Sequence, residues 1–155
     1  MAANIVYKQG DMLLGPEYFI AHGCNAQGKM GSGVAKAVRA KYPIAYEEYY
    51  QAWARHQLTL GNVIVAHAKD RCIFNIITQT FYGRDPNVVY VDYDAIRDGI
   101  LFINDFMRNY AHPSVAFPRI GASLGGGDWK VISSIIENAA TFQPVVYIHE
   151  VDPDA

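Results

Sequence analysis

Two glycine-rich segments hold the residues of this sequence whose types and spacing most clearly suggest chemistry. The first is Gly28-Lys29-Met30-Gly31-Ser32-Gly33, the second is Gly125-Gly126-Gly127, and a stretch with helical periodicity follows each of them. Glycine exposes backbone N–H groups, and the start of a helix adds the positive end of its dipole, so each segment can receive an anion. For either segment alone, a tight turn or close helix packing is the competing interpretation. Two equivalent junctions favour a ligand with two phosphates.

Neither segment matches a common nucleotide-binding motif. No Lys-Ser or Lys-Thr pair follows the last glycine, as a Walker A loop requires, and the G-x-G-x-x-G spacing of dinucleotide-binding loops is absent. The sequence therefore disfavours a kinase, an ATPase or an NAD-dependent dehydrogenase.

Three side chains beside these segments are candidates for catalysis. His22 is expected where a strand gives way to the first segment, and it could transfer a proton or hold a terminal phosphate, although a lone histidine is more often structural. Asp128 could orient a water molecule, but an Asp directly before a helix is also a favoured N-cap. Cys24 is a weaker nucleophile candidate, because neighbouring His22 is its only evident basic partner.

The elements that must position these residues follow from hydrophobic periodicity. Helical spacing appears from Val34, again from Pro43 with Tyr46, Tyr49, Tyr50 and Trp53 on one side, and then over 96–110 and 129–139. Apolar runs predict strands at 5–8, 18–21, 62–68, 72–78, 114–117 and 144–148. Strands alternating with helices predict one domain over 1–155, an α/β sandwich with helices on both faces of the sheet.

Composition excludes several classes of protein. The formal net charge of −2 predicts no strong nucleic-acid binding, which depends on clustered Lys and Arg. Cys24 and Cys72 form no C-x-x-C pair, and no histidine cluster accompanies them, so no disulfide framework, metal or cofactor is indicated. Residues 1–10 lack a signal-peptide core, and no apolar run approaches the ~20 residues that span a bilayer. We therefore expect a cytoplasmic protein that does not associate with membranes.

Five short motifs lie in order along the chain: QGDML at 9–13, HGCN at 22–25, GSGVA at 31–35, FPRIG at 117–121 and GGGDW at 125–129. Their order and spacing resemble the macrodomain family. Within the family, the chain is most similar to the branch that contains the yeast-type ADP-ribose 1″-phosphate phosphatase. That likeness depends on the HGCN motif, on ITQTFYG at 77–83 and on VVY at 145–147. The resemblance implies a three-layer α/β/α sandwich with a mixed central sheet.

The resemblance also implies a ligand, ADP-ribose or a close derivative, free or attached to a macromolecule. Asp11 would accept a hydrogen bond from the adenine amino group, and Asn25 would bind the distal ribose. From the residues alone, Asp11 also suits an Asx turn, Asn25 could stabilise its own loop, and Tyr147 could pack in the core. The complete set of implied ligand-binding residues is Asp11, Met12, Asn25, Gly31, Ser32, Gly33, Val34, Ser123, Leu124, Gly125, Gly126, Gly127 and Tyr147.

The implied activity is hydrolysis of the terminal phosphate of ADP-ribose 1″-phosphate, assisted by His22 and Asp128. Two alternatives remain: a reader that binds ADP-ribose without turnover, and a hydrolase that removes ADP-ribose from protein or nucleic acid. The sequence departs from related hydrolases. Ala35 stands where one hydrolase branch carries an aspartate, and Gln79 and Gly125 lie near the positions of a lysine and an aspartate in another.

Overall fold

The computed structural model describes residues 3–111, 113–122 and 124–149, which form one six-stranded sheet between helices. The sheet order is β1-β6-β5-β2-β4-β3; β3 pairs antiparallel with β4, and every other neighbouring pair is parallel. The predicted mixed sheet is therefore confirmed. The strands are β1 (Val6–Gln9), β2 (Phe19–Asn25), β3 (Val63–His67), β4 (Cys72–Gln79), β5 (Ser114–Phe117) and β6 (Gln143–Ile148).

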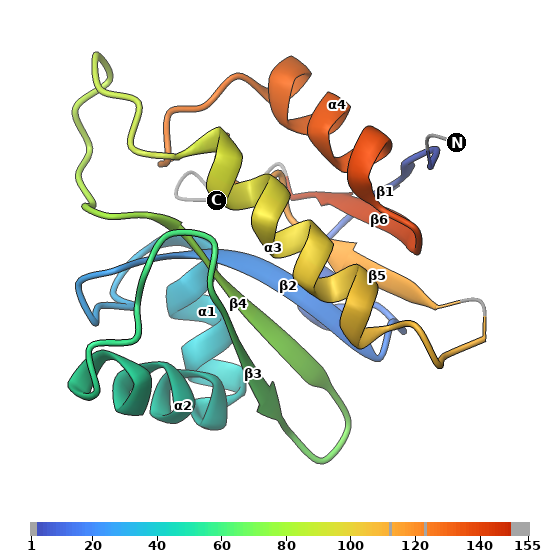
Figure 1. Ribbon diagram of the computed structural model, residues 1–155, viewed down its shortest axis with the longest axis horizontal. Helices are drawn as coiled ribbons and strands as arrows, with labels where there is room; N and C mark the ends of the chain where they lie inside the picture. The colour runs from blue at the N-terminus through green and yellow to red at the C-terminus, as the bar shows by residue number, and fades with distance from the viewer. Residues whose placement is uncertain (1–2, 112, 123, 150–155) are drawn as a thin grey trace.

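Helices cover both faces of this sheet, which confirms the three-layer architecture. Helices α1 and α2 lie on one side, and α3 and α4 pack against each other on the opposite side (Figure 1). Pro43 opens α2, as its fixed φ angle favours at the first helical position. The helices are α1 (Gly33–Lys41), α2 (Pro43–Ala54), α3 (Tyr93–Phe106) and α4 (Trp129–Ala139), with a short 3-10 helix η1 (Met12–Leu14) before β2. Among the described residues, no helix has the length and apolar character needed to cross a bilayer.

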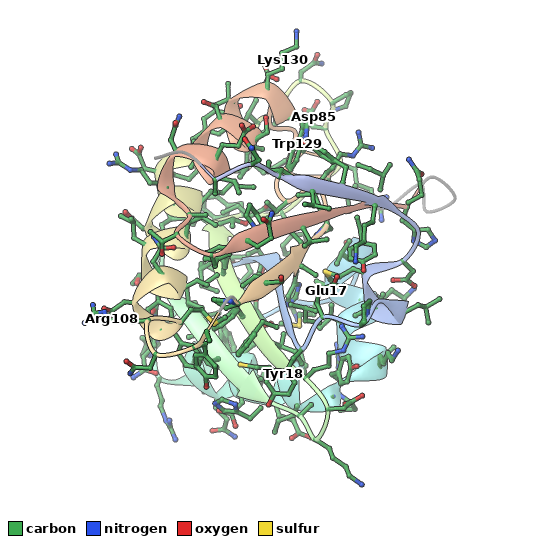
Figure 2. The ribbon with its side chains drawn as sticks, turned by 90° about the vertical axis from the view of Figure 1, so that its right-hand side faces the viewer. Glu17, Tyr18, Asp85, Arg108, Trp129 and Lys130 are labelled. Atoms are coloured by element: carbon green, nitrogen blue, oxygen red, sulfur yellow. The ribbon has the colours of Figure 1, made fainter. Side chains whose placement is uncertain are left out.

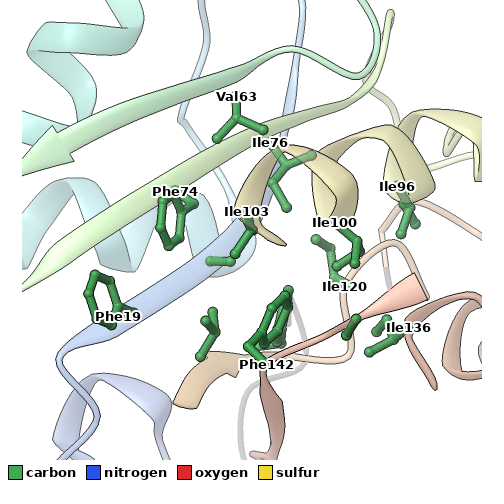
Figure 3. Close-up of a cluster of buried hydrophobic side chains, with 14 of the residues drawn as sticks. Phe19, Val63, Phe74, Ile76, Ile96, Ile100, Ile103, Ile120, Ile136 and Phe142 are labelled. Carbon is green, nitrogen blue, oxygen red and sulfur yellow. The ribbon is translucent and has the colours of Figure 1, made fainter. Parts of the chain in front are cut away.

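Strand β4 contributes to the core on both faces of the sheet. Successive side chains of a strand point to opposite faces, so Phe74 and Ile76 join the apolar cluster under α3 and α4, while Ile73 and Ile77 join clusters under α1 and α2. Figure 3 shows Phe74 and Ile76 close to Ile103 of α3. This two-sided burial is why the strand reads as a nearly continuous apolar run.

Strand β2 differs most from its predicted bounds. It continues beyond Ala21 to Asn25, and His22 and Gly23 pair with Asn75 and Ile76 of β4. A polar residue and a glycine broke the local apolar pattern, but the neighbouring strand provides their partners. The prediction that His22 lies at the end of the strand was therefore wrong.

The aromatic face predicted for α2 is only partly directed inward. Tyr49 is fully buried, whereas Tyr50 and Trp53 are 44% and 42% exposed. Their rings follow one another along the helix, with 5.5 Å between the centroids of Tyr50 and Trp53. Helical spacing correctly grouped these residues, but only tertiary packing determined which of them enters the core.

Candidate functional site

A cleft of about 690 Å³ lies at the carboxyl ends of β2, β4 and β5. Its walls come from the end of β2, the start of α1, the segment after β4 and the segment after β5. In open α/β sheets, ligands bind in the crevice outside the carboxyl ends of the strands, and this volume suits a nucleotide-sized molecule. The predicted ligand-binding residues that line it are Asn25, Gly31, Ser32, Gly33, Val34, Leu124 and Gly125.

The first glycine segment leaves the start of α1 open to this cleft. Gly33 has a φ of 61°, in the left-handed region that favours glycine, and a Cβ on Gly31 would meet nothing within 4 Å. Ser32 is the N-cap residue, yet its side chain makes no capping hydrogen bond. The first-turn N–H groups have no acceptor within the helix, so together with the helix dipole they are suited to accept an anion.

The second glycine segment is used largely for packing. Gly126 has a φ of 72°, and a Cβ there would come within 2.6 Å of the Val88 carbonyl oxygen. A Cβ on Gly127 would lie 2.6 Å from Val91 Cγ1. The Gly125 carbonyl accepts a hydrogen bond of 3.0 Å from the Val91 N–H. Close packing therefore explains Gly126 and Gly127, while Gly125 remains at the cleft wall.

Asp128 caps the helix that follows this second segment. Its Oδ1 accepts a 2.9 Å hydrogen bond from the Lys130 N–H, and its own backbone N–H donates to the Tyr93 hydroxyl at 3.0 Å. Lys130 projects outward from this turn, at the same end of the molecule as Asp85 (Figure 2). Because a carboxylate already occupies the start of α4, this helix end is a poor phosphate site. Asp128 does not line the cleft, and the geometry favours its capping interpretation over a catalytic one.

His22 lies inside the sheet beneath the cleft rather than in it. Its side chain has no solvent exposure, and Nε2 lies 2.5 Å from Asn75 Oδ1. Asn75 Nδ2 donates to the Ala45 carbonyl, which assigns Oδ1 as acceptor and His22 Nε2 as donor. Burial lowers the pKa of His22 to about 4, although the Asn75 hydrogen bond opposes this shift. The ring is therefore neutral near pH 7, and the geometry favours a structural role.

Cys24 lines the cleft but is not activated for nucleophilic attack. The residue is 3% exposed, and its Sγ lies 3.7 Å from His22 Nε2. Burial raises the pKa of the Cys24 thiol, which keeps the reactive thiolate unpopulated at neutral pH.

The residues predicted to hold adenosine do not line this cleft. Asp11 caps η1 by accepting a 2.9 Å hydrogen bond from the Leu13 N–H, and Met12 is buried against the core. Tyr147 is also buried and donates a 2.6 Å hydrogen bond to Glu17. These contacts agree with the turn and core interpretations, and contact with adenine stays a prediction. Ser123 lies outside the described residues.

Asn25 stabilises its own loop and also lines the cleft. Its Nδ2 donates to the Lys29 carbonyl at 2.9 Å, and its Oδ1 accepts from the Gln27 N–H at 2.9 Å, so the side chain organises its own loop. An amide nitrogen carries two protons, which leaves one N–H for a ligand at the cleft wall.

Positive charge in the cleft was not predicted as a binding feature. Lys29, Arg84 and Arg119 line it, and among the described lining residues there is no Asp or Glu. Lys29 and Arg119 occur within motifs recognised in the sequence, but the sequence alone does not show that these two side chains lie in the same cleft. They come together because the carboxyl ends of β2, β4 and β5 lie side by side in the sheet. The arrangement suits a ligand with several negative charges.

The chain is similar to a known protein family and to proteins that act on ADP-ribose compounds. The Macro domain family matches residues 21–136. A DNA ADP-ribosyl glycohydrolase of Thermus aquaticus is 28% identical over 137 residues, covering 86% of this chain but 37% of that protein. The ADP-ribose 1″-phosphate phosphatase of Candida albicans is 24% identical over 154 residues, covering 93% of this chain and 99% of that protein.

A solved structure agrees with the sequence comparison. The macrodomain of Mycobacterium tuberculosis DarG has a TM-score of 0.77 and 26% identity, and the match covers 94% of this chain and 97% of that one. Sequence match, sheet topology and the placement of the cleft lead to one conclusion: the chain belongs to the Macro domain family.

Proposed function

We propose that the cleft binds ADP-ribose and that the protein hydrolyses ADP-ribose 1″-phosphate to ADP-ribose and inorganic phosphate. One observation carries the proposal: the uncapped start of α1 opens into a cleft lined by the cationic side chains of Lys29 and Arg119 and, in the part of the chain that the structure describes, by no carboxylate. Backbone N–H groups and cations are the partners that phosphate oxygens prefer.

The same lining favours phosphate transfer over cleavage of a glycosidic bond. A phosphoryl group develops charge on its oxygens, which N–H groups and cations stabilise. Glycosidic cleavage passes through an oxocarbenium-like transition state, which carboxylates stabilise. Ala35 and Gln79 line the cleft, and the resemblance associates their positions with an aspartate and a lysine in related hydrolases. A substrate with an additional terminal phosphate is therefore favoured.

In this proposal the chain contributes binding and electrostatic stabilisation. The first-turn N–H groups from Gly33 to Ala35 hold the diphosphate, and Lys29 and Arg119 hold the terminal phosphate. Water attacks phosphorus and the bond from phosphorus to the C1″ oxygen breaks, so phosphate leaves and the C1″ oxygen takes a proton from solvent. His22 supports the strand beneath this site and transfers no proton.

A second candidate is the removal of ADP-ribose from DNA, which is favoured by the similarity to the glycohydrolase of Thermus aquaticus. A third, binding without turnover, is favoured by the positions of His22 and Asp128 away from the cleft. The three are separated by measuring phosphate release from ADP-ribose 1″-phosphate, ADP-ribose release from ADP-ribosylated DNA and protein, and ADP-ribose affinity by calorimetry. Phosphate release is the expected result. ADP-ribose release without phosphate release would replace the phosphatase with a glycohydrolase, and affinity without turnover would leave a reader.

Arg119→Ala tests the chemistry directly, with Arg97→Ala as the matched control, because Arg97 is an exposed residue of α3 that does not line the cleft. Loss of a charge-assisted contact to the terminal phosphate should lower turnover by about tenfold or more, while the control keeps full activity. Equal turnover in both variants would remove Arg119 from the site.

A further inference from the structure

The hydroxyl of Tyr49 lies against both ends of the short segment 25–29. It lies 2.6 Å from the Asn25 carbonyl oxygen and 2.9 Å from Asn25 Oδ1, and it accepts a 3.1 Å hydrogen bond from the Lys29 N–H. Asn25 and Lys29 both line the cleft, whereas Tyr49 belongs to α2 and does not. A single buried hydroxyl thus joins the ends of one wall of the site.

The donor and acceptor roles within this group follow from elementary chemistry. A phenol has one proton, and because the Lys29 N–H already donates to the oxygen, that proton goes to Asn25. The Asn25 carbonyl oxygen is a better acceptor for the Tyr49 O–H than Asn25 Oδ1, because it is closer and because Oδ1 already accepts from the Gln27 N–H. Burial raises the pKa of the Tyr49 hydroxyl, so the proton remains in place at neutral pH.

The tyrosine ring itself is fixed by packing. Tyr49 has no solvent exposure and shares an apolar cluster with Cys24, Met30 and Ile77. Trp53, one turn further along α2, supports the same segment from outside: Gly28 has a φ of 76°, and a Cβ there would lie 2.8 Å from the indole. Helix α2 therefore anchors the segment at two points, although it contributes no described residue to the cleft wall.

We propose that Tyr49 is a positioning residue, which holds Asn25 and Lys29 in the geometry that receives the distal ribose and its substituent. This inference depends on the proposed function, because it assigns that end of the cleft to the distal part of ADP-ribose. It adds that selectivity for ADP-ribose over ADP depends on a hydroxyl outside the cleft. The Tyr49 hydroxyl sets the position of two groups, which are the second side-chain N–H of Asn25 and the Lys29 side chain.

The test is Tyr49→Phe, which keeps the packed ring and removes only the hydroxyl. Tyr93→Phe is the matched control, because its hydroxyl also accepts a backbone N–H, at Asp128 before α4, and does not line the cleft. Calorimetry with ADP-ribose and with ADP should show an ADP-ribose affinity about tenfold lower in Tyr49→Phe and an ADP affinity within about twofold of the parent protein. Hydrogen exchange should accelerate at the Lys29 amide, and Tyr93→Phe should change none of these values.

Gly28→Ala displaces the same segment from its other side, through strain and contact with Trp53, and should give the same selective loss if Tyr49→Phe proves too unstable to assay. Unchanged ADP-ribose affinity in a folded Tyr49→Phe protein would overturn the inference and leave the proposed function intact. So would equal losses for ADP-ribose and ADP, since a purely structural tyrosine affects both ligands alike. Failure of the parent protein to bind ADP-ribose would overturn both.

Discussion

The two glycine-rich junctions look alike in the sequence but perform different physical tasks. At the first, Gly31 has open space around it and Ser32 leaves the start of α1 uncapped. At the second, Gly126 packs its backbone against the Val88 carbonyl and Asp128 caps α4. A glycine cluster before a helix therefore permits an anion site without establishing one. Whether such a junction can bind an anion depends on whether the helix is already capped and on which residues from elsewhere in the chain pack against the glycine.

The largest expected effect comes from placing a carboxylate at the open junction. In Gly31→Glu the new side chain enters free space but brings negative charge to the proposed diphosphate site. Like-charge juxtaposition costs several kcal/mol, so ADP-ribose affinity should fall by about 100-fold or more. The melting temperature should stay close to that of the parent protein. Calorimetry and thermal unfolding measure the two quantities, and retained affinity would show that the first junction does not hold the phosphates.

The packed junction should respond in the opposite way. Gly126→Ala forces a Cβ into a left-handed backbone conformation and against the Val88 carbonyl, and should lower the free energy of unfolding by about 2 kcal/mol. Gly31→Ala, at the open junction, is the matched substitution and should change the free energy of unfolding little. Denaturant unfolding measures this free energy for both variants. Equal losses of stability would show that the two junctions do not differ in packing.

The buried histidine below the open junction predicts a dependence of stability on pH. Burial lowers the folded-state pKa of His22 from 6.5 to about 4, so between these values the unfolded chain binds a proton that the folded chain does not. The contribution of neutral His22 to the free energy of unfolding is therefore fully present above pH 6.5 and is lost as the pH falls towards 4. Between pH 6.5 and 4.5 the loss should be about 2 kcal/mol.

His22→Gln removes this titration while keeping a donor for Asn75. Its free energy of unfolding should therefore fall less steeply than that of the parent protein over the same pH range. Identical slopes for the two proteins would mean that His22 is accessible to protons in the folded state, which would return it to consideration as a group in the chemical step.

The smallest effect is expected at the helix cap. Asp128→Ala removes the acceptor for the Lys130 N–H and should lower the free energy of unfolding by about 1 kcal/mol. ADP-ribose affinity and phosphate release should stay unchanged, because Asp128 does not line the cleft. Asp128→Asn, which retains an acceptor, is the control for stability. A loss of turnover without a loss of stability would instead support a catalytic Asp128.

Local pattern was sufficient for most of the architecture, and the reasons can be read in particular residues. The apolar run of β4 follows from burial on both faces, and Pro43 begins α2 because its ring fixes φ. The end of β2 was missed because His22 and Gly23 are poor strand formers, and their partners in β4 lie 53 positions away along the chain. The open junction was recognised from its glycines, whereas the cations of the cleft were not, since no local signal joins Lys29 to Arg119.

The sequence by itself predicted the family, the layered fold and a candidate anion site before α1, because hydrophobic period, proline and glycine act over a few residues. Only the tertiary structure decided between interpretations that local chemistry left open: whether His22 is exposed, whether Gly126 faces a ligand or Val88, and whether Asp128 caps the helix that follows it. Each answer depends on a contact between residues far apart in the chain. A residue type fixes which interactions a side chain can make, and the fold fixes which partner is there to make them.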